Sequence, residues 1–235
     1  MGSEMCIRDR ANSPFKSAEF IAMDAPSLIN PEAMATTTVG SFLEITSQNN
    51  LKKTYKLAYE PFFMTGDMVP DGKGGKVLAG GYVDIHNRPI MDTSVAGKER
   101  QFFSDCPDGM SLLKLAKPNA KGVSGNTVFA VVQFEYTNSN QNGDKMYAQL
   151  PSQIAVLTLN QNPRNGKLSL VKYSPVNTSS AQGLWITCGS SLSPWNTHLS
   201  SEEYEPDAPF AYENARFKSF SKNLYGNETS ANPYN

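Results

Sequence analysis

The sequence predicts an all-β fold made of short strands and irregular loops, with little helix. Apolar residues alternate with polar ones or form short β-branched and aromatic runs, and helical periodicity is almost absent. The 17 glycines and 15 prolines supply many turns. Hydrophobic residues are 39% of the 235, which is enough for a packed core. A sandwich and a propeller both fit this pattern.

The strongest strands are expected in the middle of the chain, where β-branched residues are most frequent. The dipeptide Asn165-Gly166 precedes one of them and is typical of a β-hairpin turn. Residues 72–75 (GKGG) are expected to form a hairpin tip, and residues 109–117 fit either one helical turn or a short strand. The strands are expected within 41–60 and 76–85 and at 127–136, 154–159, 168–173, 185–188 and 197–203, with one short helix within 210–225.

The two ends of the chain indicate that it is a fragment of a longer protein. Residues 5–10 (MCIRDR) read like a translated transposon-end adapter, so residues 1–10 are expected to be foreign to the protein. Residues 11–40 are expected to be irregular. The β domain is expected to occupy residues 41–235 and to be truncated, because residues 226–235 are polar and turn-rich without a closing strand.

Charge and cysteine content exclude several classes of protein. The 21 basic and 22 acidic residues leave no surplus to neutralise phosphates, so we expect no nucleic-acid partner. No apolar run approaches the roughly 18 residues of a membrane span. Cys6, Cys106 and Cys188 lack the short paired spacing of a zinc site, and a bridge between Cys106 and Cys188 stays open.

One segment carries chemical information. Residues 188–205 pass from a strand through a Ser-Pro-Trp turn to the adjacent carboxylates Glu202 and Glu203. Adjacent carboxylates repel each other unless a cation or solvent relieves them. On residue types alone, the segment is either a solvated acidic loop or one edge of a metal centre.

This segment resembles the PhoX-type alkaline phosphatases of bacteria, which carry a pattern close to N-C-A-G-G-x-T-P-W-G-T-x-L-T-C-E-E. Residues 187–203 (TCGSSLSPWNTHLSSEE) align with it without gaps, and residues 131–136 and 150–152 resemble the family's N-terminal region. The resemblance implies a six-bladed β-propeller, present here as a partial set of blades, that hydrolyses phosphate monoesters with iron(III) and calcium. It also implies export to the periplasm or the extracellular space. Carried over, Glu202 and Glu203 become metal ligands, which suits the hard oxygens that calcium and iron(III) prefer.

The chain departs from the family pattern at Ser201, which stands where the family has an iron-binding cysteine. Either iron is bound differently, only calcium is bound, or the site is inactive. His198 is a further candidate for a metal or phosphate contact, with a packed histidine as the alternative. Glu135 lies either at a solvated strand end or against a polar centre, where it is a further candidate for a metal or phosphate contact.

Three functions therefore stay open at the level of sequence. The first is a fragment of a PhoX-like phosphomonoesterase, whose parent protein acts on a small phosphate ester. The resemblance places the remaining family ligands beyond residue 235, so the fragment alone is expected to be inactive. The second, which Ser201 favours, is a non-catalytic propeller that serves as a binding or surface module. The third is a carbohydrate-binding sandwich.

Overall fold

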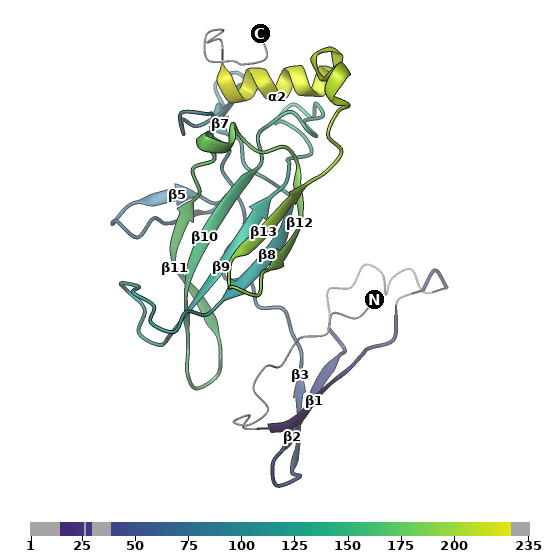
Figure 1. Ribbon diagram of the computed structural model, residues 1–235, viewed down its shortest axis with the longest axis vertical. Coiled ribbons are helices and arrows are strands. Elements are labelled where there is room, and N and C mark those ends of the chain that lie inside the picture. The colour runs from purple at the N-terminus through teal and green to yellow at the C-terminus, as the bar shows by residue number, and fades with distance from the viewer. Residues whose placement is uncertain (1–14, 26, 30–38, 227–235) are drawn as a thin grey trace. The chain divides into compact units, whose positions relative to one another are not determined.

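The computed structural model describes residues 15–25, 27–29 and 39–226 (Figure 1). Strands make up 39% of the structure and helices 10%, and the strands form several small antiparallel sheets. The prediction of a mostly β protein with little helix is thereby confirmed. The expectations for residues 1–10 and 227–235 lie outside the described residues.

The chain separates into two compact units, Met1–Pro61 and Phe62–Asn235. In the first, β1 (Phe15–Ile21), β2 (Phe42–Ser47) and β3 (Lys52–Lys56) form an antiparallel sheet. Strand β1 lies within the range that the sequence predicted to be irregular. The range 41–60 contains the β2–β3 hairpin.

The second unit is built on a four-stranded antiparallel sheet whose strands follow one another in sequence. The expected strands at 127–136, 154–159 and 168–173 correspond to its three longest members, and 109–117 is a strand at its start, not a helical turn. The turn at Asn165-Gly166 joins the last two strands, with Gly166 at a φ of 76°. The members are β8 (Pro107–Leu113), β9 (Asn126–Phe134), β10 (Gln153–Gln161) and β11 (Leu168–Pro175).

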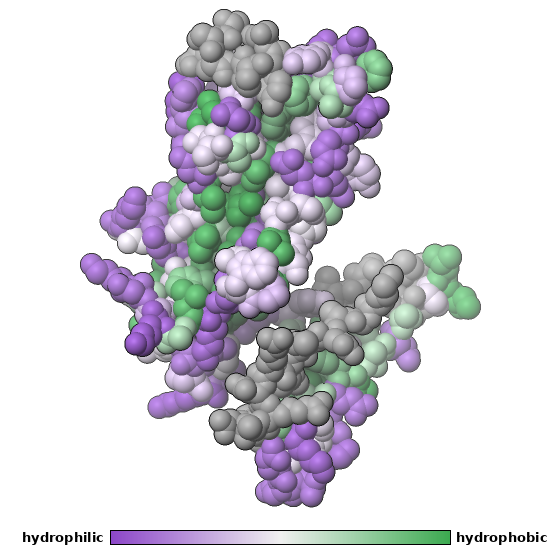
Figure 2. Space-filling model, in the orientation of Figure 1, coloured by the Kyte–Doolittle hydropathy of each residue, from purple (hydrophilic) through white to green (hydrophobic). Residues whose placement is uncertain are grey.

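One face of this sheet carries the main hydrophobic core. Ala130, Phe134 and Leu157 from β9 and β10 are fully buried there, together with Val69 of a neighbouring hairpin. That hairpin joins β4 (Met68–Pro70) to β5 (Lys76–Leu78), and its tip is the glycine-rich segment, as expected. In the space-filling view, green hydrophobic side chains reach the surface over the region of β10 and β11 (Figure 2).

The opposite face of the sheet is covered by a second hairpin, which joins β12 (Thr187–Leu192) to β13 (His198–Glu202). The hairpin can approach because β8 carries Gly109 at the contact. A Cβ at Gly109 would lie 2.5 Å from the carbonyl oxygen of Cys188 and 2.7 Å from the Cβ of Ser190. Such separations are far shorter than van der Waals contact, so only glycine admits this packing.

A helix packs across one end of the unit and forms a second core. Helix α2 (Ala215–Tyr225) begins at Asn214, whose side chain accepts hydrogen bonds from the N–H groups of Arg216 and Phe217. Its buried face, with Phe220 and Leu224, packs on Trp185 and Ile186. The helix lies within the range where one short helix was expected.

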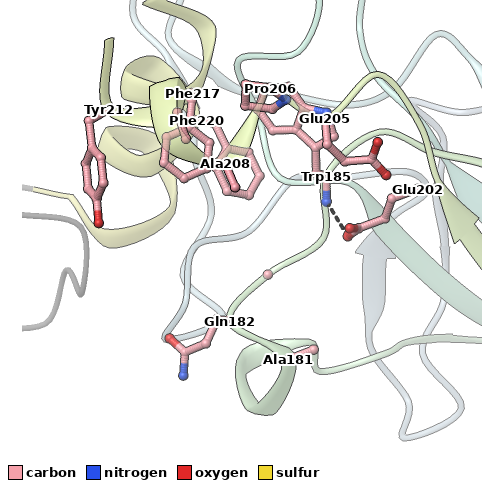
Figure 3. A pocket seen from close by; sticks show the side chains of 12 residues that line it. Ala181, Gln182, Trp185, Glu202, Glu205, Pro206, Ala208, Tyr212, Phe217 and Phe220 are labelled. Atoms are coloured by element: carbon pink, nitrogen blue, oxygen red, sulfur yellow. Dashed lines mark hydrogen bonds between the residues drawn. The ribbon is translucent and has the colours of Figure 1, made fainter. Parts of the chain in front are cut away.

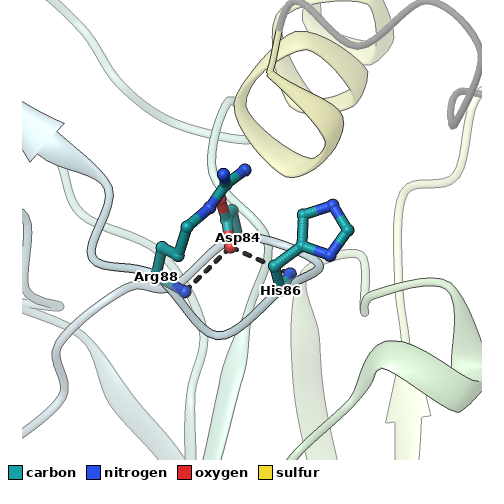
Figure 4. A network of polar contacts seen from close by, with 3 residues as sticks. All are labelled: Asp84, His86 and Arg88. Atoms are coloured by element: carbon teal, nitrogen blue, oxygen red, sulfur yellow. Dashed lines mark hydrogen bonds and ion pairs between the residues drawn. The ribbon is translucent and has the colours of Figure 1, made fainter.

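The C-terminal end of α2 is attached to a tight loop. The carboxylate of Asp84 accepts from the backbone N–H groups of His86 and Arg88, and the Arg88 guanidinium pairs with it at 2.7 Å (Figure 4). The N–H of Ile85, inside this loop, donates to the carbonyl of Leu224. The remaining elements are β6 (Met91–Asp92), β7 (Arg100–Gln101), and the short 3-10 helices η1 (Ser179–Ala181) and η2 (Ala208–Glu213).

Candidate metal centre

Three side chains capable of binding a metal come together between the four-stranded sheet and the hairpin that covers it. Asp108 belongs to β8, Glu135 follows β9 directly, and Cys188 belongs to β12. One ligand atom from each lies within 4.8 Å of the other two. The cluster therefore joins segments that are 80 residues apart in sequence.

Glu203 adds a third carboxylate to this group. It follows β13 directly, and its N–H donates to the carbonyl of Ile186. Its side chain interacts with the carboxyl group of Glu135 and with the thiol of Cys188. We call Asp108, Glu135, Cys188 and Glu203 the acidic cluster.

The backbone around Glu135 is fixed by hydrogen bonds on both sides. Its N–H donates to the carbonyl of Cys106 at 3.0 Å, and the hydroxyl of Ser152 donates to its carbonyl at 2.6 Å. The residue is only 6% exposed. A carboxylate held so firmly out of solvent needs a polar or charged partner.

The electrostatics of the cluster show a concentration of negative charge. Burial raises the pKa of Glu135, and the nearby charges of Asp108 and Glu203 raise it further, against a lowering by the hydrogen bond from Cys106. A hydrogen bond to Asp108, burial and the proximity of Glu203 raise the pKa of the Cys188 thiol to about 12. A bound cation would reverse both shifts, because it favours the ionised forms of its ligands.

A second thiol lies against the same carboxylate. The Cys106 Sγ donates to Glu135 Oε2 at 3.4 Å, and its hydrogen bond with Tyr136 raises the pKa of that phenol to about 12. Cys106 and Cys188 are both free thiols, so the bridge that the sequence left open is not formed.

The structure separates the two carboxylates that the sequence placed together. Glu203 joins the acidic cluster, whereas Glu202 Oε1 accepts a hydrogen bond from the backbone N–H of Trp185 at 2.7 Å (Figure 3). Successive side chains of an extended strand point to opposite sides, which explains the divergence. Of the predicted candidates, the structure thus brings Glu135 and Glu203 together.

Ser201 and His198 lie outside the acidic cluster. Ser201 is exposed, and its hydroxyl donates to the carbonyl of Gly189 at 3.0 Å. His198 lies between Ser111 Oγ at 2.9 Å and Gln133 Oε1 at 3.0 Å. Gln133 Oε1 can only accept, so His198 Nε2 carries the proton and Nδ1 accepts from Ser111. Both ring nitrogens of His198 therefore have hydrogen-bond partners within the protein.

Sequence reasoning missed two members of the cluster. Asp108 stands between Pro107 and Gly109, a composition typical of a turn, and Cys188 was interpreted as a buried apolar residue. The register of β8 against β9 shifts between Pro107 and Met110, and this irregularity surrounds Asp108. No sequence signal marks such a β-bulge, so only the three-dimensional packing reveals the group.

The fold and the cluster define a class: a mostly β protein with a carboxylate and thiol site at the junction of a four-stranded sheet and a hairpin. Comparisons of the chain with protein-family models, with curated proteins and with solved structures found no match. Within the described residues, no helix is both long enough and apolar enough to cross a membrane.

Proposed function

We propose that this chain is part of a PhoX-like, metal-dependent phosphomonoesterase and that the acidic cluster is its metal centre. The observation that carries the proposal is the position of Glu203. This residue comes from the segment that resembles the phosphatase family, and its carboxylate interacts with Glu135 and Cys188. Those two residues form a close group with Asp108.

The donor set fits the metals that the resemblance implies. Asp108, Glu135 and Glu203 offer hard carboxylate oxygens, which suit calcium and iron(III). Cys188 adds a thiol, which ionises readily once a metal is bound and suits iron. The carbonyl of Gly189 accepts a hydrogen bond from the hydroxyl of Ser201, the residue that replaces the family cysteine. Because Cys188 precedes Gly189, its thiol belongs to the strand that lies opposite Ser201 in the hairpin.

A bound cation would polarise the phosphoryl oxygens of the substrate and offset the charge that develops on them. The chain itself supplies the buried carboxylate of Glu135.

The proposal includes a partial β-propeller. Its support is the four-stranded antiparallel sheet β8–β9–β10–β11, in which neighbours in space are neighbours in sequence. This arrangement is the unit from which propeller blades are built. The resemblance to the PhoX-type phosphatases also implies that the protein works outside the cytoplasm.

The proposal is tested by loading the purified chain with calcium and iron(III) and measuring hydrolysis of p-nitrophenyl phosphate. We expect release of p-nitrophenol that requires the metal, and a loss of about 100-fold or more in Glu135→Gln. Glu44→Gln, which changes a carboxylate of the first unit, is the matched control. Bound metal without turnover would reject the enzymatic function for this chain.

A second function is favoured by one observation. Ser201 is exposed and bound to the backbone of Gly189, so it supplies no ligand to the cluster. A chain that has lost the family cysteine would serve as a non-catalytic binding or surface module. Stoichiometric calcium, without iron and without turnover, is the result that this function predicts.

A further inference from the structure

A pocket of about 350 Å³ lies beside the C-terminal end of β13 and is also lined by residues of η2 and α2. This volume falls within the range of about 300–1,000 Å³ that is usual for small-molecule sites. Trp185, Phe217 and Phe220 form an aromatic wall, and Tyr212 stands at the far side (Figure 3). The proposed metal centre does not use this pocket.

The aromatic wall is held rigidly by ring-to-ring packing. Trp185 meets Phe220 edge-on with ring centroids 5.2 Å apart, and Phe217 stacks on Phe220 at 6.1 Å. Phe220 belongs to the buried core under α2, and Trp185 is 7% exposed. The wall is therefore in place before any ligand arrives, which reduces the entropy cost of binding.

The charges that line the pocket are all negative. Glu202 and Glu205 contribute carboxylates, which lie beside Trp185 in Figure 3. Among the residues that the structure describes, no Lys, Arg or His lines the pocket. Glu202 is fixed in place because its Oε1 accepts from the Trp185 N–H.

We propose that this pocket binds an organic cation, a substituted ammonium group with an apolar body. Aromatic faces attract such cations through the ring quadrupole, and the attraction grows when the cation is desolvated. The two carboxylates supply the opposite charge, and the apolar wall accommodates the alkyl substituents. An anionic ligand, such as a free phosphate, is disfavoured by the same carboxylates.

The inference stands apart from the metal centre. Glu202 and Glu203 are adjacent in sequence, but their side chains serve the pocket and the acidic cluster respectively. The pocket can therefore be tested without a metal, and its failure would leave the phosphatase proposal unchanged.

The test is isothermal titration of the full chain with choline, and with 3,3-dimethylbutan-1-ol as its neutral isostere. We expect choline to bind and the isostere to bind at least about tenfold more weakly. The variant Glu202→Gln keeps an acceptor for the backbone N–H of Trp185 but removes the negative charge of Glu202. The variant Glu205→Gln removes the negative charge of the second carboxylate. Each should weaken choline binding about tenfold.

Glu213→Gln is the matched control, because Glu213 is exposed and does not line the pocket. The affinity of the Glu213→Gln variant for choline should equal that of the unmodified chain. Circular dichroism of each variant verifies that the fold is retained. Equal binding of choline and its isostere, no binding of choline, or full choline affinity in Glu202→Gln and Glu205→Gln would overturn the proposal.

Discussion

At the scale of single residues, adjacent side chains at the end of one strand serve different environments. Glu202 binds the backbone of Trp185, and Glu203 meets Glu135 and Cys188. The family resemblance gave both the same role, because a sequence does not show which side of a strand faces a polar centre. The alternation of an extended strand makes the distinction once the position of the strand is known.

His198 predicts a pH dependence of stability. Burial lowers the pKa of its ring below the usual 6.5. Above pH 6.5 both the folded and the unfolded states are neutral at this site. Below pH 6.5, the His198 ring binds a proton more readily in the unfolded chain than in the folded chain. The free energy of unfolding therefore falls as the pH falls.

The measurement is urea unfolding of the unmodified chain and of His198→Gln between pH 7.5 and pH 5. Gln can still donate to Gln133 Oε1 but does not titrate. We expect the stability advantage of the unmodified chain to shrink as the pH falls through 6.5, by at most about 1.4 kcal/mol per pH unit and by less than that for a partly exposed ring. An advantage that is constant over this range would contradict the account.

Asp92 predicts a loss of stability when its charge is removed. The residue is 1% exposed, and its carboxylate accepts from the N–H and hydroxyl of Ser94 and from the N–H of Gln141. Although burial raises its pKa, these hydrogen bonds outweigh that effect, and the pKa of Asp92 is lowered. The ionised Asp92 carboxylate therefore stabilises the folded state at pH values above its ordinary pKa of 3.8. This contribution is lost as the pH falls through the lowered pKa of the folded state.

We expect Asp92→Asn to lower the free energy of unfolding at pH 7 by about 2 kcal/mol, since hydrogen bonds to a charged acceptor are worth about 1.5–3 kcal/mol. Denaturant unfolding measures the change. Asp207→Asn, at an exposed position, should leave stability within about 0.5 kcal/mol. An Asp92→Asn chain as stable as the control would show that the buried carboxylate contributes nothing.

At the scale of elements, the hairpin β12–β13 brings the acidic cluster together by lying close against β8. Gly109 allows that approach, because any Cβ there would meet the Cys188 carbonyl and the Gln133 amide, at 2.5 and 2.7 Å. Gly109→Ala is therefore expected to displace the hairpin and to cost about 1–3 kcal/mol of stability. It should also weaken metal binding although no ligand is changed.

The control for this change is Gly189→Ala, in the hairpin itself. The nearest atom to a Cβ at Gly189 is Ser201 Oγ, 3.3 Å away, and this side chain can turn aside. Unfolding and calcium titration of both variants give the comparison. If Gly109→Ala binds metal as tightly as Gly189→Ala does, the close approach of the hairpin is not what positions the cluster.

The elements themselves were largely predictable from local pattern. Strands β9 and β10 are rich in β-branched and apolar residues, and Asn165-Gly166 marks the hairpin to β11, so neighbouring residues alone indicate them. The acidic cluster depends instead on contacts between residues far apart in sequence. Asp108 reaches it through a bulge and Cys188 through the packing of a hairpin, and neither leaves a periodic signal.

At the scale of the whole molecule, a nearly neutral chain concentrates negative charge at two places in its second unit. The net charge is −1, yet Asp108, Glu135 and Glu203 gather at the cluster, while Glu202 and Glu205 line the pocket. Like charges held close together repel each other unless a cation or solvent offsets them. This distribution is the physical reason for proposing a metal ion at one place and an organic cation at the other.

The most direct test of the central claim is calcium and iron(III) binding by the full chain, measured by elemental analysis after equilibrium dialysis. The unmodified chain is compared with Glu203→Gln and with Glu202→Gln, which removes the adjacent charge outside the cluster. The account predicts stoichiometric metal in the unmodified chain and in Glu202→Gln, and at least about tenfold weaker binding in Glu203→Gln. No bound metal in the unmodified chain, or equal binding in Glu203→Gln, would contradict it.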